Sequence, residues 1–243
     1  MVKIIALIPA RSGSKGVPNK NVRLLGGRSL LEWSIAASLK SRLIERTIVS
    51  TDSPEYASLS IGLGAEVPFI RPASISGDTS TDYEFIKHAL EWLDANNTLP
   101  EYIVHIRPTT PFRNPRVVDD AIEAFIESEQ ATALRSVHLM SESAYKTFEL
   151  SSDGRLKRLF SESTQLDMAN NARQVFPDTY SANGYVDVLS VSFILRNKII
   201  HGDYVLPFLT PPAPEIDTES DFVGLEQLIE IDPSISSSIF GPD

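Results

Sequence analysis

The first half of the chain alternates between short apolar runs and segments in which apolar residues recur at helical spacing. Runs rich in β-branched residues predict strands at 3–8, 47–52, 102–106 and 131–137. Helical spacing predicts helices at 29–39, 54–60, 81–95 and 115–128, the first opened by a capping box of Ser29 and Glu32. A short strand near a sheet edge is predicted at 65–69, because Pro68 cannot donate within a central strand. This alternation predicts a three-layer, Rossmann-like α/β fold with a mixed, mainly parallel sheet.

The pattern becomes polar and hairpin-like between residues 140 and 183. Segments 147–150 and 156–160 flank Asp153 and Gly154, a dipeptide that favours a tight turn. Residues 184–191 read as a strand again, and Thr218 is suited to cap a final helix that runs through Glu230. The tail at 234–243 is predicted to be loose. We therefore expect a single domain over 1–243, with 140–183 as an excursion from it.

Composition excludes several classes of function. The chain has 243 residues, a net charge of -10 and no cysteine, so neither disulfides nor thiolate metal sites are possible. The negative charge argues against binding to nucleic acid or acidic membranes. We find no apolar run of membrane-spanning length and no signal-peptide pattern, and we therefore expect a soluble, cytoplasmic protein.

The two ends of the chain carry opposite charges. Residues 1–31 hold six lysines and arginines and no acid, whereas no lysine or arginine follows Lys198. If both ends border one cleft, the first is suited to an anion and the second to a divalent metal. Both could equally be solvated faces, the usual fate of charge runs.

Residues 7–21 form the most informative stretch, L-I-P-A-R-S-G-S-K-G-V-P-N-K-N, directly after the first predicted strand. Loops at the carboxyl ends of strands bind ligands in open α/β sheets. Its glycines, serines, arginine and two lysines supply tight turns, donors and positive charge, a composition suited to a polyphosphate. The loop is not a P-loop, because Lys15 precedes Gly16 and Val17 follows it, and the fingerprint G-x-G-x-x-G is absent.

This stretch resembles the signature of the acylneuraminate cytidylyltransferases, within the nucleotide-sugar pyrophosphorylase superfamily. The resemblance implies a nucleotide-diphospho-sugar transferase fold with CTP bound by the first loop. Arg11 and Lys20 are then expected on the triphosphate as catalytic cations. The further nucleotide contacts that it implies in the loop are Ala10, Ser14, Lys15 and Asn21.

Three further segments match the family. Arg71, in an R-P-A segment, is expected to recognise cytosine, with Asp78 and Ser80 of a D-T segment beside the base. Pro108 to Arg113 resembles the loop at the family's sugar site, so Thr109 and Thr110 are expected to contact the sugar. The resemblance also places Lys146, Arg173 and Asn183 at this sugar site.

The chain departs from the family at the sugar site. Arg107 stands where glutamine is usual, and Ser181 stands where an arginine is usual. One positive charge is gained and another lost, which suggests a sugar acid with altered substituents whose carboxylate is held by Arg107. Two unrelated surface substitutions would produce the same pattern.

The segment from Glu215 to Asp221 matches the family's metal-binding motif, with Glu215 in place of its first aspartate. In an extended segment Glu215 and Asp217 point the same way, so both could hold Mg²⁺. Asp217 is the expected main ligand and third catalytic residue. The four histidines share no metal-ligand spacing, and His105 reads as a core histidine with its hydrogen bonds satisfied.

These motifs predict a Mg²⁺-dependent cytidylyltransferase that joins CTP to a nonulosonic acid, a nine-carbon 3-deoxy-2-keto sugar acid such as a sialic acid. The resemblance also implies a homodimer held through the excursion. Two alternatives stay open. The enzyme could use the eight-carbon 3-deoxy-octulosonate, or the chain could be a non-catalytic nucleotide-binding regulatory protein, given the substitutions at 107, 181 and 215.

Overall fold

The structure is a computed structural model that describes residues 3–160 and 165–241. These residues build a six-stranded sheet in the order β10-β6-β9-β5-β1-β4. Only β9 runs antiparallel to its neighbours in this sheet. The strands are β1 (Ile4–Pro9), β4 (Arg46–Ser50), β5 (Tyr102–His105), β6 (Ala133–Leu139), β9 (Tyr180–Ser190) and β10 (Val205–Leu209).

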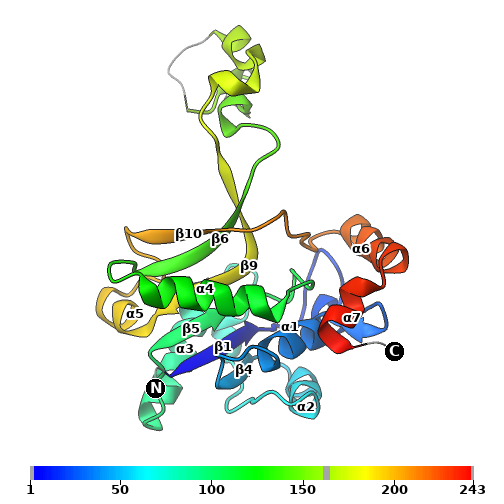
Figure 1. Ribbon diagram of the computed structural model, residues 1–243, viewed down its shortest axis with the longest axis vertical. Helices are drawn as coiled ribbons and strands as arrows, with labels where there is room; N and C mark the ends of the chain where they lie inside the picture. Colours follow the sequence, from blue (N-terminus) through cyan, green and yellow to red (C-terminus); the bar gives the residue numbers. More distant parts are fainter. Residues whose placement is uncertain (1–2, 161–164, 242–243) are drawn as a thin grey trace.

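Helices cover both faces of this sheet (Figure 1). One face packs against α1 (Leu30–Leu39), α2 (Pro54–Gly62) and α4 (Pro115–Glu127). The other face packs against α3 (Asp82–Ala95) and α5 (Val191–Asn197). The predicted three-layer α/β fold with a mixed, mainly parallel sheet is therefore confirmed. Each helix among the described residues is too short or too polar to span a membrane.

Local capping explains where the helices start. Ser29 accepts a hydrogen bond from the Glu32 amide at 3.1 Å, but the Glu32 carboxylate binds Arg28, so the predicted reciprocal capping box does not form. Thr81 and Glu84 do form such a box at the start of α3. Thr218 caps α6 (Glu219–Ile231), as predicted. A small ribbon of β2 (Leu24–Leu25) and β3 (Arg28–Ser29) precedes α1.

Beyond β6 the chain leaves the body and returns in β9, and the ends of these two strands form a stalk below the projecting segment (Figure 1). The predicted hairpin is present as β7 (Phe148–Leu150) and β8 (Leu156–Arg158). A short 3-10 helix at Lys20–Val22 ends the first loop, and others lie at Ala73–Ile75, Ala144–Lys146, Leu166–Asn170 and Arg173–Val175. Residues 161–164 of the predicted excursion lie outside the described residues. The return strand starts at Tyr180, four residues before the predicted 184, because it pairs with β6 along the stalk.

Two further sequence predictions about local structure are wrong. Residues 65–69 form no strand but one isolated bridge, between Glu66 and Ile48, since Pro68 interrupts pairing two residues later. The tail is not loose between 234 and 240, because it forms α7 (Ser234–Phe240). The Phe240 ring packs edge-on against Trp33 at 4.9 Å and lies under the Arg28 guanidinium at 4.0 Å.

Candidate active site

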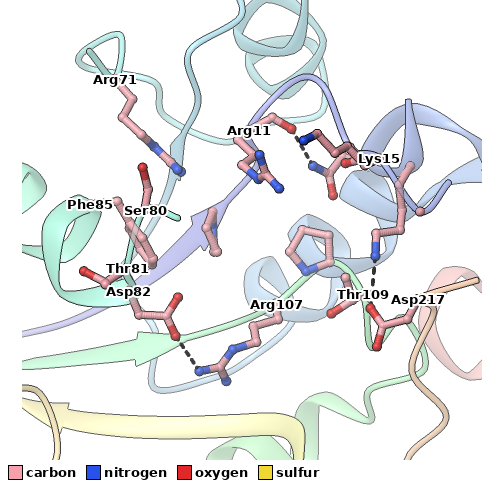
Figure 2. Close-up of a pocket in the computed structure, with 16 residues that line it drawn as sticks. Arg11, Lys15, Arg71, Ser80, Thr81, Asp82, Phe85, Arg107, Thr109 and Asp217 are labelled. Carbon is pink, nitrogen blue, oxygen red and sulfur yellow. Dashed lines mark hydrogen bonds and ion pairs between the residues drawn. The ribbon is translucent and has the colours of Figure 1, made fainter. Parts of the chain in front are cut away.

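A cavity of about 360 Å³ opens where the first loop meets the carboxyl ends of β1 and β5 (Figure 2). Arg11, Lys15 and Lys20 of the first loop line it, and Asp217 lines the same cavity from the opposite end of the chain. The two oppositely charged ends of the sequence therefore do border one cleft.

Hydrogen bonds with Asp52 and Asn21 hold the first loop in place. Asp52, just beyond β4, accepts from both the backbone nitrogen and the hydroxyl of Ser12 at 2.7 Å. Partial burial opposes ionisation of Asp52, but these hydrogen bonds outweigh it and lower its pKa. Asn21 donates from its side chain to the Arg11 carbonyl at 3.0 Å. Asn21 therefore supports the loop that presents Arg11.

Lys20 joins the first loop to the segment that carries Asp217. Its ammonium lies 3.3 Å from Asp217 Oδ1 and donates to the Ile216 carbonyl at 2.7 Å. Asp221 in the first turn of α6 accepts from the backbone nitrogen of Asp217 at 3.1 Å. The cap of α6 thus fixes the backbone from which the Asp217 carboxylate projects.

Arg11 and Lys15 share one carboxylate. Asp78, from the loop before α3, accepts from Arg11 at 2.8 Å and also pairs with Lys15. The hydrogen bonds from Lys15 and Arg11 lower the pKa of Asp78. A triphosphate bound by these two cations must therefore compete with Asp78.

Arg71 is buried against the end of β4. Its guanidinium donates to the side chain and carbonyl of Ser50 and lies 4.9 Å from the centre of the Phe85 ring. Burial lowers the Arg71 pKa to about 10, so it remains positively charged at neutral pH. Ser80 lies on the same wall of the cavity.

Arg107 is held between two carboxylates. One terminal nitrogen donates to Asp187 at 2.9 Å and the other to Asp82 at 3.0 Å. Asp187 is 1% exposed; burial opposes its ionisation, but the neighbouring His201, Arg107 and Arg135 outweigh that effect and lower its pKa. Both terminal nitrogens of Arg107 are thus already paired with an acid.

His105 lies near Arg107 and its two carboxylate partners and is fully buried. His105 is thus a core residue, as predicted, but neither ring nitrogen has a hydrogen-bond partner among the described residues, so the prediction that its hydrogen bonds are satisfied is wrong. Burial lowers its pKa to about 3. His105 is therefore neutral at physiological pH.

Arg113 fixes the loop after β5 through hydrogen bonds to backbone carbonyls. Its buried guanidinium donates to the Tyr185 and Arg107 carbonyls at 2.6 Å and to the Gly184 carbonyl at 2.9 Å. Thr109 donates to the Glu215 carboxylate at 3.0 Å. The loop that presents Arg107 and Thr109 is therefore tied both to β9 and to the Asp217 segment.

The structure brings most of the predicted nucleotide residues together and separates several others. Of the predicted site residues, the cavity is lined by Arg11, Ser14, Lys15, Lys20, Asn21, Arg71, Ser80, Arg107, Thr109 and Asp217. Ala10, Asp78, Thr110, Asn183 and Glu215 lie outside that lining, and Lys146 and Arg173 belong to the projecting segment. Asn183 instead donates to Thr210 at 2.6 Å. No group of three or more histidines and acids is arranged to hold a metal among the described residues.

Sequence reasoning missed three residues of the cavity wall, Thr81, Asp82 and Phe85. Their positions at the start of α3 have an ordinary structural explanation, because a capping threonine, an acid and an apolar residue are common there. Their proximity to Arg107 depends on the packing of α3 against the sheet.

The model of a protein family described as Cytidylyltransferase matches residues 5–192. The chain belongs to the cytidylyltransferase family. The resemblance drawn from the first loop is thereby confirmed.

Two of the relatives that cover most of the chain are 31% identical to it. The CMP-N,N'-diacetyllegionaminic acid synthase of Legionella pneumophila is 31% identical over 95% of this chain and 97% of its own length. The N-acylneuraminate cytidylyltransferase of Escherichia coli is 31% identical over 89% of this chain, which corresponds to 49% of that longer relative. Among solved structures, a CMP:2-keto-3-deoxy-manno-octonic acid synthetase complexed with CTP superposes with a TM-score of 0.67. It shares 12% identity over 95% of this chain and 99% of that chain, so this likeness shows the fold alone.

Proposed function

We propose that this cytidylyltransferase transfers CMP from CTP to the anomeric hydroxyl of a nonulosonic acid and releases pyrophosphate. The observation that carries the proposal is the meeting of Arg11, Lys15 and Lys20 with Asp217 around one cavity. Three cations on one side match a triphosphate, and an acid beside them matches its metal.

In the proposed reaction the anomeric oxygen attacks the α-phosphorus in line. A bond forms between that oxygen and phosphorus, and the bond from the α-phosphorus to the bridging oxygen of pyrophosphate breaks. Negative charge grows on the leaving pyrophosphate, where Arg11 and Lys20 stabilise it. The hydroxyl proton is released to solvent or to a nearby acceptor.

We also propose that the reaction requires Mg²⁺. The Asp217 carboxylate is largely exposed and lines the cavity, and Glu215, just outside the lining, accepts a hydrogen bond from Thr109 of the cavity wall. One or two carboxylates completed by phosphate oxygens and water form a typical magnesium environment, so the residues present fit the ion. When bound, Mg²⁺ supplies neutralisation of phosphate charge and a fixed orientation of the triphosphate.

The sugar class follows from the relatives. Those of about 31% identity include a synthase of CMP-diacetyllegionaminic acid and an N-acylneuraminate cytidylyltransferase, and both names specify nonulosonic acids. We place the sugar beside Thr109 and Arg107, which line the cavity next to Asp217. The octonic acid synthetase supports the eight-carbon alternative less well, because its likeness is one of fold.

Pyrophosphate release tests the proposal and separates its alternatives. The purified chain is assayed with CTP, Mg²⁺ and a panel of sialic, legionaminic, pseudaminic and octulosonic acids. Turnover of any nine-carbon acid supports the proposal, and turnover of octulosonate alone supports the eight-carbon alternative. CTP binding without turnover of any sugar supports a non-catalytic nucleotide-binding protein.

We further propose that the protein is a homodimer held through the projecting segment. The described part of this segment exposes apolar side chains that its own small hairpin cannot cover, among them Leu150, Phe160 and Val175. A second copy that covers this surface would also bring Lys146 and Arg173 near the sheet and helices of that copy. Light scattering during size-exclusion chromatography tests this directly, and a monomer at micromolar concentration contradicts it. Cytoplasmic localisation stays a prediction.

A further inference from the structure

One wall of the cavity combines an aromatic ring with a donor and an acceptor. Phe85 and Asp82 lie three residues apart in α3 and so share a face of that helix. Arg71 approaches the Phe85 ring from the end of β4. Figure 2 shows Arg71, Phe85 and Asp82 on the same side of the cavity, away from Lys15 and Asp217.

Asp82 is fixed by a buried chain of charges. Its Oδ2 accepts from Arg107, and Arg107 is held in turn by the buried carboxylate of Asp187. No hydrogen bond reaches Asp82 Oδ1 from the described residues, and 42% of the side chain is exposed. Burial opposes ionisation of Asp82, but the charge of Arg107 and its hydrogen bond favour the carboxylate, and the net effect is a lowered pKa. The cavity therefore contains an oriented carboxylate with one oxygen available to a ligand.

This wall suits a nucleobase better than a ribose. A base has a flat face that packs on an aromatic ring, and polar atoms around its edge that need one donor and one acceptor. A ribose offers hydroxyls but no face for Phe85. The cations that match the phosphates lie at the other end of the same cavity, in Arg11, Lys15 and Lys20.

We infer that Asp82 accepts a hydrogen bond from the 4-amino group of cytosine and thereby selects CTP over UTP. The inference rests on the proposed function. Cytosine and uracil differ at position 4, where cytosine has a donor and uracil an acceptor. A carboxylate held by Arg107 accepts from the amine and repels the oxo group. Arg107 acts here as a positioning residue.

Binding of CTP and UTP to Asp82→Asn tests this inference, with titration calorimetry of the full chain as the measurement. An amide can turn its NH₂ group toward the 4-oxo group of UTP, so UTP should gain affinity while CTP loses it. A hydrogen bond to a charged group typically changes binding by about tenfold to a hundredfold. We therefore expect the affinity ratio of CTP to UTP to fall at least about tenfold. The matched control is Glu91→Gln, an acid on the same helix outside the cavity that pairs with Lys87.

A second measurement gives its main result with the unaltered chain alone. The unaltered chain should bind the triphosphate of pyrimidin-2-one riboside, which lacks the 4-amino group, about tenfold or more weakly than CTP. Asp82→Asn should largely lose this discrimination.

The outcomes separate the inference from the proposed function. If the unaltered chain binds no CTP, the proposed function fails. If it prefers CTP and Asp82→Asn keeps the full preference over UTP, only the inference is overturned. A loss of preference for CTP over 2′-deoxy-CTP, with the CTP to UTP ratio unchanged, would also overturn it and place Asp82 on the ribose.

Discussion

Gly16 and Asp217 come from opposite ends of the sequence and touch through their backbones. A Cβ atom on Gly16 would lie 2.4 Å from the Asp217 carbonyl oxygen, closer than real Cβ atoms approach. The first loop can meet the Asp217 segment at this distance only because residue 16 has no side chain. This contact brings Lys15 and Lys20 to the same cavity as the Asp217 carboxylate.

Gly16→Ala should push the two segments apart. Because the obstacle is backbone, the loop or the Asp217 segment must shift, which misplaces the cations relative to the acid. Displacements on the order of 1 Å can cost about a hundredfold in rate, so we expect kcat/KM for CTP to fall at least about tenfold. The steady-state rate of pyrophosphate release measures this.

The matched control is Gly62→Ala at the end of α2, where an added Cβ meets nothing within 4 Å. This change should leave the activity as it is and slightly raise the free energy of unfolding, since alanine favours a helix over glycine by up to about 1 kcal/mol. Equal activity of both variants would contradict the close-contact argument.

Asp78→Asn should strengthen CTP binding. The substitution removes an acid that pairs with Arg11 and Lys15 and competes with the triphosphate. Solvent-exposed ion pairs such as these contribute little free energy, so their loss frees the two cations at small cost. The expected gain in CTP affinity is therefore about twofold to fivefold, and it is largest at low salt. Calorimetric titration at two salt concentrations measures it. Weaker binding would instead support a direct contact of Asp78 with the nucleotide.

Arg107→Gln separates two roles for Arg107. If Arg107 positions Asp82, the KM for CTP should rise about tenfold while the KM for the sugar acid changes less than about threefold. If Arg107 held the sugar carboxylate, the sugar KM would rise instead. The geometry favours the first result, because both terminal nitrogens are already on carboxylates.

The same substitution should also destabilise the fold, because it leaves the buried Asp187 without its main partner. Loss of one member of a buried pair typically costs about 3–5 kcal/mol. The double variant Arg107→Gln with Asp187→Asn should recover part of this loss, and urea unfolding measures both. If the double variant is no more stable than Arg107→Gln, the pair is not the source of the loss.

His105 should make stability pH-dependent. The unfolded chain protonates this histidine near pH 6.5, whereas the folded chain does so only near pH 3. Between these values the unfolded state binds more protons, so the stability supplied by neutral His105 is complete above pH 6.5. It is lost as pH falls toward 3, by at most about 1.4 kcal/mol per pH unit.

His105→Phe tests this dependence, since it replaces the imidazole by an apolar ring that packs beside Phe85. Between pH 7 and 5 the free energy of unfolding of this variant should fall about 1 kcal/mol per unit less steeply. Identical slopes in the two proteins would show that His105 is not the titrating group.

Much of the fold could be predicted from the sequence because its signals are local. The strands at Ile4–Pro9 and Tyr102–His105 are apolar runs, and the starts of the helices carry capping residues such as Thr81 and Thr218. The helix at Ser234–Phe240 could not be predicted, because its serine-rich sequence has little helical preference. It packs through Phe240 against Trp33, a residue far away in the chain, and the local sequence carries no signal of that contact.

The candidate site likewise contains residues that carry a sequence signal and residues that only the packing of the fold reveals. Arg11, Lys20 and Asp217 were identified by resemblance to a family motif, and the structure brings them to one cavity. Asp82 and Asp187 had no such signal. One is an acid at a helix start and the other an acid in a strand, and their shared partner, Arg107, becomes visible only once α3 and β9 pack around β5.

The most direct test of the central claim compares the unaltered chain with Asp217→Asn. Pyrophosphate release is measured with CTP, Mg²⁺ and a nonulosonic acid, and circular dichroism checks that both proteins are folded. We predict CTP- and Mg²⁺-dependent release by the unaltered chain and a loss of at least about a hundredfold in kcat/KM for the variant. Release that is equally fast without Asp217, or none with any sugar acid, would contradict the account.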